Sequence, residues 1–215
     1  PLGVSEKFKG SSNWGEYGDA IQELDYNVGR IFDSLKRLGI DDNTIVVYSS
    51  DQGFWLGEHG WFDKRWMYEE SLHTPLLVRW PGVTKPGSTN DALVSNLDFA
   101  ETFLDIARTE TPKDMQGRSL KPLLSGKIPA DWRKTHYYHY YEAGGHGVPI
   151  HYGVTDGRFK LIRFPDEKLN TWEFFDLKTD PMEMKSRYSD SKYVQRVGDL
   201  KKELTRLRRQ YRVKE

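Results

Sequence analysis

The fold of this chain is decided by residues 44–75, TIVVYSSDQGFWLGEHGWFDKRWMYEESLHTP. Residues 44–48 are mostly β-branched and apolar, which predicts a short buried strand. The chain then leaves the strand through a polar loop that contains Gly53. Because ligands in open α/β sheets bind beyond the carboxyl ends of the strands, we expect the chemistry of the protein in this loop.

The loop and the residues after it offer four side chains suited to a polar site: Asp51, Gln52, His59 and Lys64. The oxygens of Asp51 and Gln52 are hard donors that suit calcium or magnesium, and the ammonium of Lys64 suits an anionic group beside the metal. The local pattern alone leaves another interpretation open. Asp51-Gln52-Gly53 is also typical of a solvated turn, and Lys64 of a surface lysine.

The composition excludes several classes of function. The chain has 215 residues, a formal net charge of zero and no cysteine. The balanced charge gives no nucleic-acid footprint, and no apolar run reaches the roughly 20 residues that span a membrane. Without cysteine, the chain has no disulfide, no thiolate metal site and no cysteine nucleophile.

The flanking sequence predicts α/β units. Apolar residues recur at three- and four-residue steps over 16–38, which predicts an amphipathic helix that ends at Gly39. A second buried strand is expected at 76–80, with a short helix at 66–72 before it. Asp98 is predicted to be the N-cap of a helix that runs to about Ile106, and a further short helix is expected at 120–124.

Beyond residue 128 short aromatic-rich strands replace the helices. Strands are predicted at 135–141, 150–155, 159–164 and 172–176, and Asp156-Gly157 is a hairpin signal. The last helix is expected over 191–211. Its apolar face would be formed by Val194, Val197, Leu200, Leu204 and Leu207.

Several motifs, taken in order, resemble type I sulfatases of the alkaline phosphatase superfamily. They are Ser50-Asp51-Gln52-Gly53, Leu56-Gly57-Glu58-His59-Gly60, Lys64, Thr74-Pro75-Leu76, Gln116-Gly117-Arg118 and Asp180-Pro181-Met182-Glu183. The resemblance covers nearly the whole chain. It implies an α/β fold in which residues 1–127 are the C-terminal part of a mixed sheet flanked by helices. Residues 128–215 would be a small α+β subdomain with antiparallel strands and a long C-terminal helix.

The resemblance also implies roles for individual residues. Asp51 matches a metal-binding aspartate, and Gln52 stands where relatives more often have asparagine or histidine. The resemblance implies that the metal is a divalent cation, and calcium is the one expected. Lys64 matches a lysine that contacts the sulfate, and it is the predicted catalytic residue. His59, His73 and His146 are candidate substrate contacts, although His59 would alternatively cap backbone groups in its tight loop.

The departures from the family pattern limit what this chain does alone. Relatives use a formylglycine made in a Cys/Ser-x-Pro-x-Arg motif, which is absent here. We therefore expect the formylglycine and further metal ligands to lie in an N-terminal half of the same enzyme, which would be the partner of this segment. This segment alone is expected to be inactive. The compartment stays open, and only the resemblance favours a periplasmic or secreted protein.

Three functions remain in view at this point. The first is hydrolysis of sulfate esters of a small molecule or glycan, the second is phosphate-ester or phosphonate hydrolysis, and the third is a non-catalytic binding or assembly module. Tyrosines and histidines gather in the C-terminal part, at His136–Tyr141, His146 and His151. They would form either a sugar-binding wall or, for most of them, the core of the small sheet. The loop 144–147, which carries His146, is the candidate that faces substrate.

Overall fold

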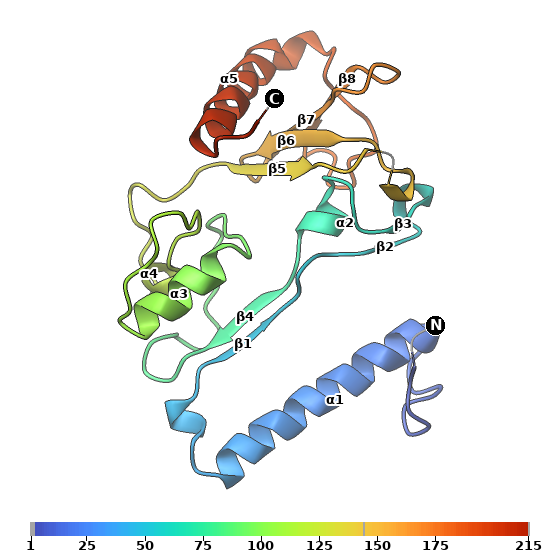
Figure 1. Ribbon diagram of the computed structural model, residues 1–215. Helices are drawn as coiled ribbons and strands as arrows, with labels where there is room; N and C mark the ends of the chain where they lie inside the picture. The colour runs from blue at the N-terminus through green and yellow to red at the C-terminus, as the bar shows by residue number, and fades with distance from the viewer. Residues whose placement is uncertain (1–2, 144, 215) are drawn as a thin grey trace. The chain divides into compact units, whose positions relative to one another are not determined.

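The computed structural model describes residues 3–143 and 145–214. The chain divides into two compact units: residues up to Val46 together with Val78–Val83, and Val47–Leu77 together with the chain from Thr84 onward. Figure 1 shows their helices and strands. The boundary predicted near residue 127 stays a prediction, and Gly144, part of the predicted substrate-facing loop, lies outside the described residues.

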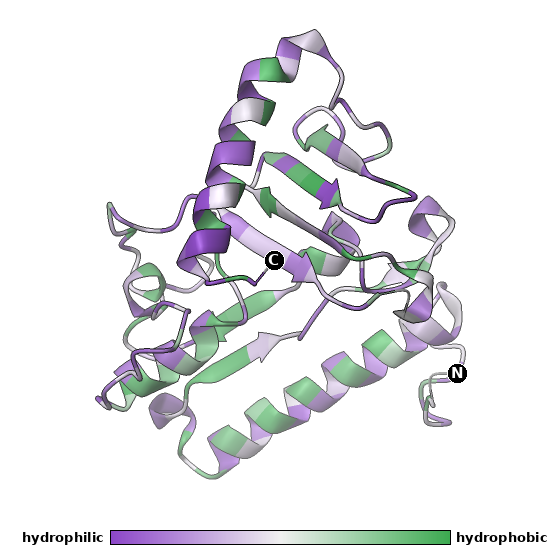
Figure 2. Ribbon diagram, turned by 45° about the horizontal axis from the view of Figure 1, so that its top comes forward, coloured by the Kyte–Doolittle hydropathy of each residue, from purple (hydrophilic) through white to green (hydrophobic). Residues whose placement is uncertain are grey.

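The first unit contains α1 (Gly15–Arg37) and the 3₁₀ turn η1 (Asp41–Asn43). The predicted helix is confirmed to within one residue at each end, and Gly39 follows it with a φ of +66°. The buried carboxylate of Asp19 accepts hydrogen bonds from the backbone N–H groups of Gly10 and Ser12, both at 2.8 Å. Figure 2 shows hydrophobic and hydrophilic residues alternating along this helix, as its amphipathic pattern requires.

The predicted strands around the central loop are present, but their predicted burial is wrong, because each of their residues is half-buried or exposed. They are β1 (Val46–Ser49) and β4 (Leu76–Arg79), which neighbour each other in a two-stranded sheet. Between them the chain forms an antiparallel hairpin of β2 (Trp55–Leu56) and β3 (Phe62–Asp63), with the turn η2 (Glu58–Gly60) at its tip. The helix predicted over 66–72 is shorter than expected, because α2 spans only Glu69–Leu72.

Two helices follow: α3 (Asp98–Ile106) and α4 (Lys121–Leu124). The predicted capping role of Asp98 is wrong. The N-cap is Leu97, and the carboxylate of Asp98 is completely buried, where it forms a two-point ion pair with Arg133, with both N–O distances at 2.5 Å. A buried charge needs a partner, and the guanidinium provides two hydrogen bonds at once.

No helix in the described residues is long and apolar enough to cross a membrane.

The C-terminal part is an antiparallel four-stranded sheet in the order β5-β6-β7-β8. All four strands were predicted, and Gly157 turns the chain between β6 and β7 with a φ of +87°. The loop between β5 and β6 holds the turn η3 (Gly145–Gly147). The strands are β5 (His136–Tyr140), β6 (His151–Thr155), β7 (Phe159–Phe164) and β8 (Thr171–Asp176).

The final helix, α5 (Val194–Gln210), follows the turn η4 (Ser191–Tyr193) and covers one face of the sheet. Val194, predicted to lie on its apolar face, is 65% exposed, because it begins the helix outside the contact. The buried contact is made by Val154, Leu161 and Phe174 of the sheet with Val197, Leu200, Leu204 and Leu207 of the helix. Each such side chain contributes roughly 1.5–3 kcal/mol by leaving water.

The opposite face of the sheet packs on the segment around the central loop. Ile162 and Phe175 join one buried cluster with Trp55, Met67 and Tyr68. One face of the sheet therefore supports the β2–β3 hairpin and the start of α2, while α5 covers its other face. Because Trp55 and Tyr68 lie on either side of His59 and Lys64 in the sequence, this packing fixes the backbone that carries these two candidates.

Candidate active site

Asp51 and Gln52 follow β1, as predicted, and the side chain of Asp51 is exposed to solvent. Their backbone is held in place by neighbours. Asn96 donates from Nδ2 to the carbonyl oxygen of Asp51 at 2.6 Å, and Ser50 donates from Oγ to the carbonyl of Gln52 at 2.7 Å. The Asp51 carboxylate accepts a hydrogen bond from the Gln52 N–H at 3.0 Å. The loop thus presents a carboxylate on a supported backbone.

Gly53 is where this loop presses against α2. Its N–H donates to the carbonyl oxygen of Ser71 at 2.8 Å. A Cβ at this position would lie 1.9 Å from the carbonyl oxygen of Glu70, which no side chain tolerates. Only glycine permits so close an approach of the two backbones. Trp55 adds a second tie, because its indole N–H donates to the hydroxyl of Ser71 at 2.7 Å.

His59 lies inside an aromatic cluster and not in the open. Its ring stacks on Trp61 with centroids 5.6 Å apart and meets the edge of Trp55 at 5.0 Å. The side chain is only 12% exposed, and its Nε2 lies 3.9 Å from a carboxylate oxygen of Glu70. The backbone of His59 is left-handed, with a φ of +55°.

Lys64 follows the β2–β3 hairpin and keeps one third of its side chain exposed. Its Nζ lies 3.6 Å from a carboxylate oxygen of Asp63 and 5.9 Å from the ring centre of Phe54. Asp63 also forms an ion pair with Arg65. One carboxylate therefore faces two cationic side chains, which leaves a local excess of positive charge beside the hairpin.

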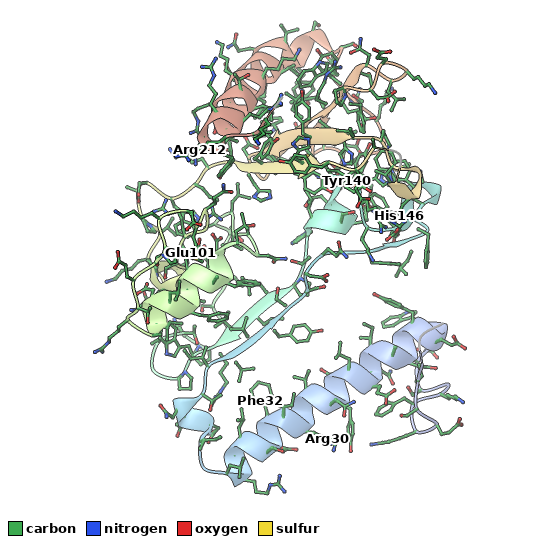
Figure 3. All side chains as sticks on the ribbon, viewed as in Figure 1. Arg30, Phe32, Glu101, Tyr140, His146 and Arg212 are labelled. Atoms are coloured by element: carbon green, nitrogen blue, oxygen red, sulfur yellow. The ribbon has the colours of Figure 1, made fainter. Side chains whose placement is uncertain are left out.

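The remaining two candidate histidines, His73 and His146, lie at the surface. His73 follows α2, its side chain is 83% exposed, and its Nδ1 lies 3.8 Å from a carboxylate oxygen of Glu69. His146 is exposed in η3, where its φ is +58°. Figure 3 labels His146 beyond the end of β5, which is marked by Tyr140. Both imidazoles are accessible to a ligand, and their predicted contact with substrate is not decided by this placement.

The donor set around Asp51 fits part of a hard-cation site. Asp51 and Gln52 bring carboxylate and carboxamide oxygens, the ligands that calcium prefers, but calcium takes six to eight oxygens. Within residues 3–143 and 145–214 no group of three or more histidine, cysteine, aspartate or glutamate side chains is arranged to hold a metal ion. A complete site would need ligands beyond the two predicted here.

A buried charge cluster escaped the sequence analysis. Lys160, on β7, is completely buried, and its Nζ lies 2.8 Å from carboxylate oxygens of both Glu69 and Glu183. The other oxygen of Glu183 accepts the backbone N–H of Glu69 at 2.7 Å. Burial raises the pKa of the Glu183 carboxyl to about 7, against the lowering effect of Lys160. The sequence signal that could have revealed this cluster is Lys160 itself, a lysine at an inward-facing position of a mostly apolar strand.

The cluster fixes the start of α2, and the rest of α2 supports the loop. Glu69 is held by Lys160 and Glu183 from the sheet, whereas Glu70 and Ser71 contact Gly53. Tyr68, the residue before α2, donates its hydroxyl to the carboxylate of Glu173 on β8 at 2.5 Å. The sheet therefore sets the position of α2, which in turn sets the backbone that carries Asp51 and Gln52.

Comparison with known proteins identifies relatives. Residues 57–210 match the family model described as N-sulphoglucosamine sulphohydrolase, C-terminal, and residues 3–109 match the sulfatase model. The chain is 48% identical over 200 residues to N-acetylglucosamine-6-O-sulfatase of Bacteroides thetaiotaomicron, covering 92% of this chain and 36% of that protein. It is also 31% identical to the arylsulfatase of Clostridium perfringens, over 86% of this chain and 38% of that protein.

Two solved structures extend the comparison. One, in complex with its substrate D-glucosamine-2-N,6-O-disulfate, superposes with a TM-score of 0.86 at 48% identity, covering 90% of this chain and 40% of that one. The other is the phosphonate monoester hydrolase of Agrobacterium radiobacter, with a TM-score of 0.80 at 26% identity, covering 91% of this chain and 41% of that one. The chain thus spans well under half the length of these relatives.

Proposed function

The chain belongs to the sulfatase family, and from this premise we propose that the protein containing it hydrolyses sulfate esters of a sulfated amino sugar or glycan. The observation that carries the proposal is the 48% identity, over 92% of this chain, to N-acetylglucosamine-6-O-sulfatase. That alignment spans 36% of the relative, so the activity proposed is that of the full-length protein.

The loop after β1 would hold the divalent cation. Asp51 and Gln52 would bind it through their side-chain oxygens, with Asp51 the firmer ligand because Gln52 adds a methylene to the usual asparagine. A calcium ion, when bound, would polarise the sulfate group. The hydrogen bonds from Asn96 and Ser50 to the loop backbone support this role, because they fix the backbone that carries the two side chains before a ligand arrives.

Lys64 would bind an anionic oxygen of the sulfate and stabilise negative charge that develops there. The positive excess beside Asp63 supports this assignment, because Arg65 takes part of that carboxylate and leaves the ammonium available. The chain contains no cysteine and no Ser-x-Pro-x-Arg motif. The formylglycine would therefore come from another part of the full-length protein.

A second candidate is hydrolysis of phosphonate monoesters. It is favoured by the likeness to the Agrobacterium radiobacter enzyme, at 26% identity over 91% of this chain. Sulfate and phosphonate esters both present anionic oxygens that the same lysine and cation would bind.

The test is a substrate comparison with the full-length protein. N-acetylglucosamine 6-sulfate and a phenyl phosphonate monoester are offered separately, and released sulfate and phenol are measured in the same buffer with calcium. We expect kcat/KM for the sulfate ester to exceed that for the phosphonate ester. Hydrolysis of the phosphonate ester alone would favour the second candidate, and hydrolysis of neither would contradict both assignments.

A further inference from the structure

A cavity of about 450 Å³ opens between the start of β5, the end of α5 and the segments around α3. In Figure 3, Arg212 marks this end of the sheet, whereas His146 lies at the other end of β5. None of the six candidate site residues lines this cavity: Asp51, Gln52, His59, Lys64, His73 and His146. The lining consists of Ser95, Leu97, Gln116, Arg133, His136, Tyr137, His139, Tyr141, Tyr211 and Val213.

Aromatic rings form one wall of the cavity. The rings of His139 and Tyr141 stack with centroids only 3.7 Å apart, and Tyr137 lies 6.0 Å from Tyr211. Tyr141 is nevertheless 65% exposed, so the ring face turned away from His139 is accessible. The hydroxyl of Tyr137 lies 2.9 Å from Nδ1 of His139, which fixes the orientation of that imidazole. The wall is therefore preorganised before any ligand binds.

The cavity lining carries no net charge at neutral pH. Arg133 is neutralised by its two-point ion pair with the buried carboxylate of Asp98. Burial, together with the nearby positive charge of Arg208, lowers the pKa of His139 to about 4. Burial likewise lowers the pKa of His136. The residues that line the cavity therefore offer no unpaired charge to an anion or a cation; Arg208, which lies near His139 and 4.4 Å from the ring centre of Tyr152, is not one of them.

Uncharged polar groups surround these rings. Gln116, Ser95 and the two neutral imidazoles offer hydrogen-bond donors and acceptors. Aromatic faces bordered by such groups suit a ring that is apolar on its faces and hydroxylated at its edge. A pyranose sugar has this pattern, and a volume of about 450 Å³ lies within the usual range for small-molecule pockets.

The cavity is physically connected to the loop after β1. Ser95 and Leu97 line it, and Asn96 between them donates its hydrogen bond to the carbonyl of Asp51. One side of this short segment faces the cavity and the other holds the loop. The cavity is thus separate from the candidate metal site but shares a wall segment with it.

We propose that this cavity is a second carbohydrate site, which binds one uncharged sugar ring of a glycan separately from the candidate site of Asp51 and Lys64. The proposal is independent of the chemistry proposed for the loop, because it concerns binding of a sugar without sulfate. Side chains alternate along β5, so Tyr138 and Tyr140 stack with His151, whereas Tyr137, His139 and the following Tyr141 line the cavity.

The experiment measures binding of N-acetylglucosamine to the full-length protein by saturation-transfer NMR and titration. Tyr141→Ala removes an exposed stacking face and should weaken binding about tenfold, the equivalent of about 1.4 kcal/mol. Tyr141→Phe keeps the face and should bind within about twofold of the unaltered protein. Gln116→Leu, a second exposed position, should also weaken binding because a hydrogen-bonding group is lost.

Lys64→Ala separates this proposal from the proposed function. It should leave N-acetylglucosamine binding unchanged even if it abolishes sulfate release, and Tyr141→Ala should leave release of sulfate from the monosaccharide unchanged. Unaltered unfolding midpoints show that the variants are folded. Absence of binding in the unaltered protein, equal binding by Tyr141→Ala and Tyr141→Phe, or loss of binding in Lys64→Ala would overturn the proposal.

Discussion

The two sides of α2 meet very different surroundings. On one side the carboxyl groups of Glu69 and Glu183 each lie 2.8 Å from the ammonium of the completely buried Lys160. On the other side Glu70 and Ser71 support a loop whose Asp51 is exposed to solvent. The buried side has its charges satisfied within the chain, and the exposed side presents charges to whatever binds.

This difference separates stability from chemistry. Removing a partner from the buried cluster leaves an uncompensated charge, so it should cost folding free energy. Removing an exposed charge from the loop should cost little stability and most of the activity. Removal of a charge should therefore lower stability on the buried side and activity on the loop side, which the following predictions examine in the full-length protein.

The largest loss of stability is expected for Lys160→Met. The change leaves the carboxylates of Glu69 and Glu183 side by side without their cation, and we expect the free energy of unfolding to fall by about 3–5 kcal/mol. Urea unfolding measures it. Lys168→Met, at an exposed position, is the control and should change stability by less than about 0.5 kcal/mol. A similarly small change at Lys160 would contradict the role given to the cluster.

Gly53→Ala tests the contact between the loop and α2. The added Cβ would meet the carbonyl oxygen of Glu70 at 1.9 Å, so the loop must shift, at an expected cost of up to about 3 kcal/mol. Gly198→Ala in α5 is the matched control, because nothing lies within 4 Å of its added Cβ. That variant should gain roughly 0.5–1 kcal/mol from helix propensity. Equal unfolding midpoints for the two variants would refute the close approach.

The pH dependence of stability sharpens the account of the buried side. Burial raises the pKa of Glu183 from 4.5 to about 7, with Lys160 opposing and Glu69 adding to the rise. Between these two pH values the folded state binds more protons than the unfolded state, so this group's stabilisation is full below pH 4.5 and is lost as the pH rises through 7.

Glu183→Gln replaces the titrating carboxyl group of Glu183 by an uncharged amide of nearly the same shape. The free energy of unfolding of the unaltered protein, minus that of the variant, should fall by about 2 kcal/mol between pH 5 and pH 8. Urea unfolding at both pH values measures the difference. A difference that stays constant, or that grows with pH, would show that Glu183 does not hold a proton in the folded state.

The sequence predicted the elements whose signals are local. The helix at Gly15–Arg37 and all four strands of the C-terminal sheet follow from apolar periodicity and from the turn at Asp156-Gly157. The loop of Asp51 and Gln52 was found because it follows a β-branched, apolar strand, although the residues of that strand are only half-buried. Each of these predictions needs only neighbouring residues, which is why a single sequence was sufficient.

The contacts that escaped prediction join residues far apart in the chain. Asp98 pairs with Arg133, and Lys160 meets Glu69 and Glu183, so no periodic pattern reveals either ion pair. Asp98 looked like a helix cap because aspartate is common there, and the distant arginine decided otherwise. His59 stood beside glycines in an apparently open loop, yet four aromatic rings, including its own, gather around that position.

The central claim is that Asp51, Gln52 and Lys64 carry the chemistry of the full-length protein. A variant of Lys64, the predicted catalytic residue, tests it most directly. The measurement is kcat for sulfate release from N-acetylglucosamine 6-sulfate by the full-length Lys64→Ala variant, together with its free energy of unfolding, with Lys127→Ala as the control at an exposed lysine. We predict that kcat falls about 100-fold or more while stability changes by less than about 0.5 kcal/mol. A kcat close to that of the Lys127→Ala control would contradict the claim.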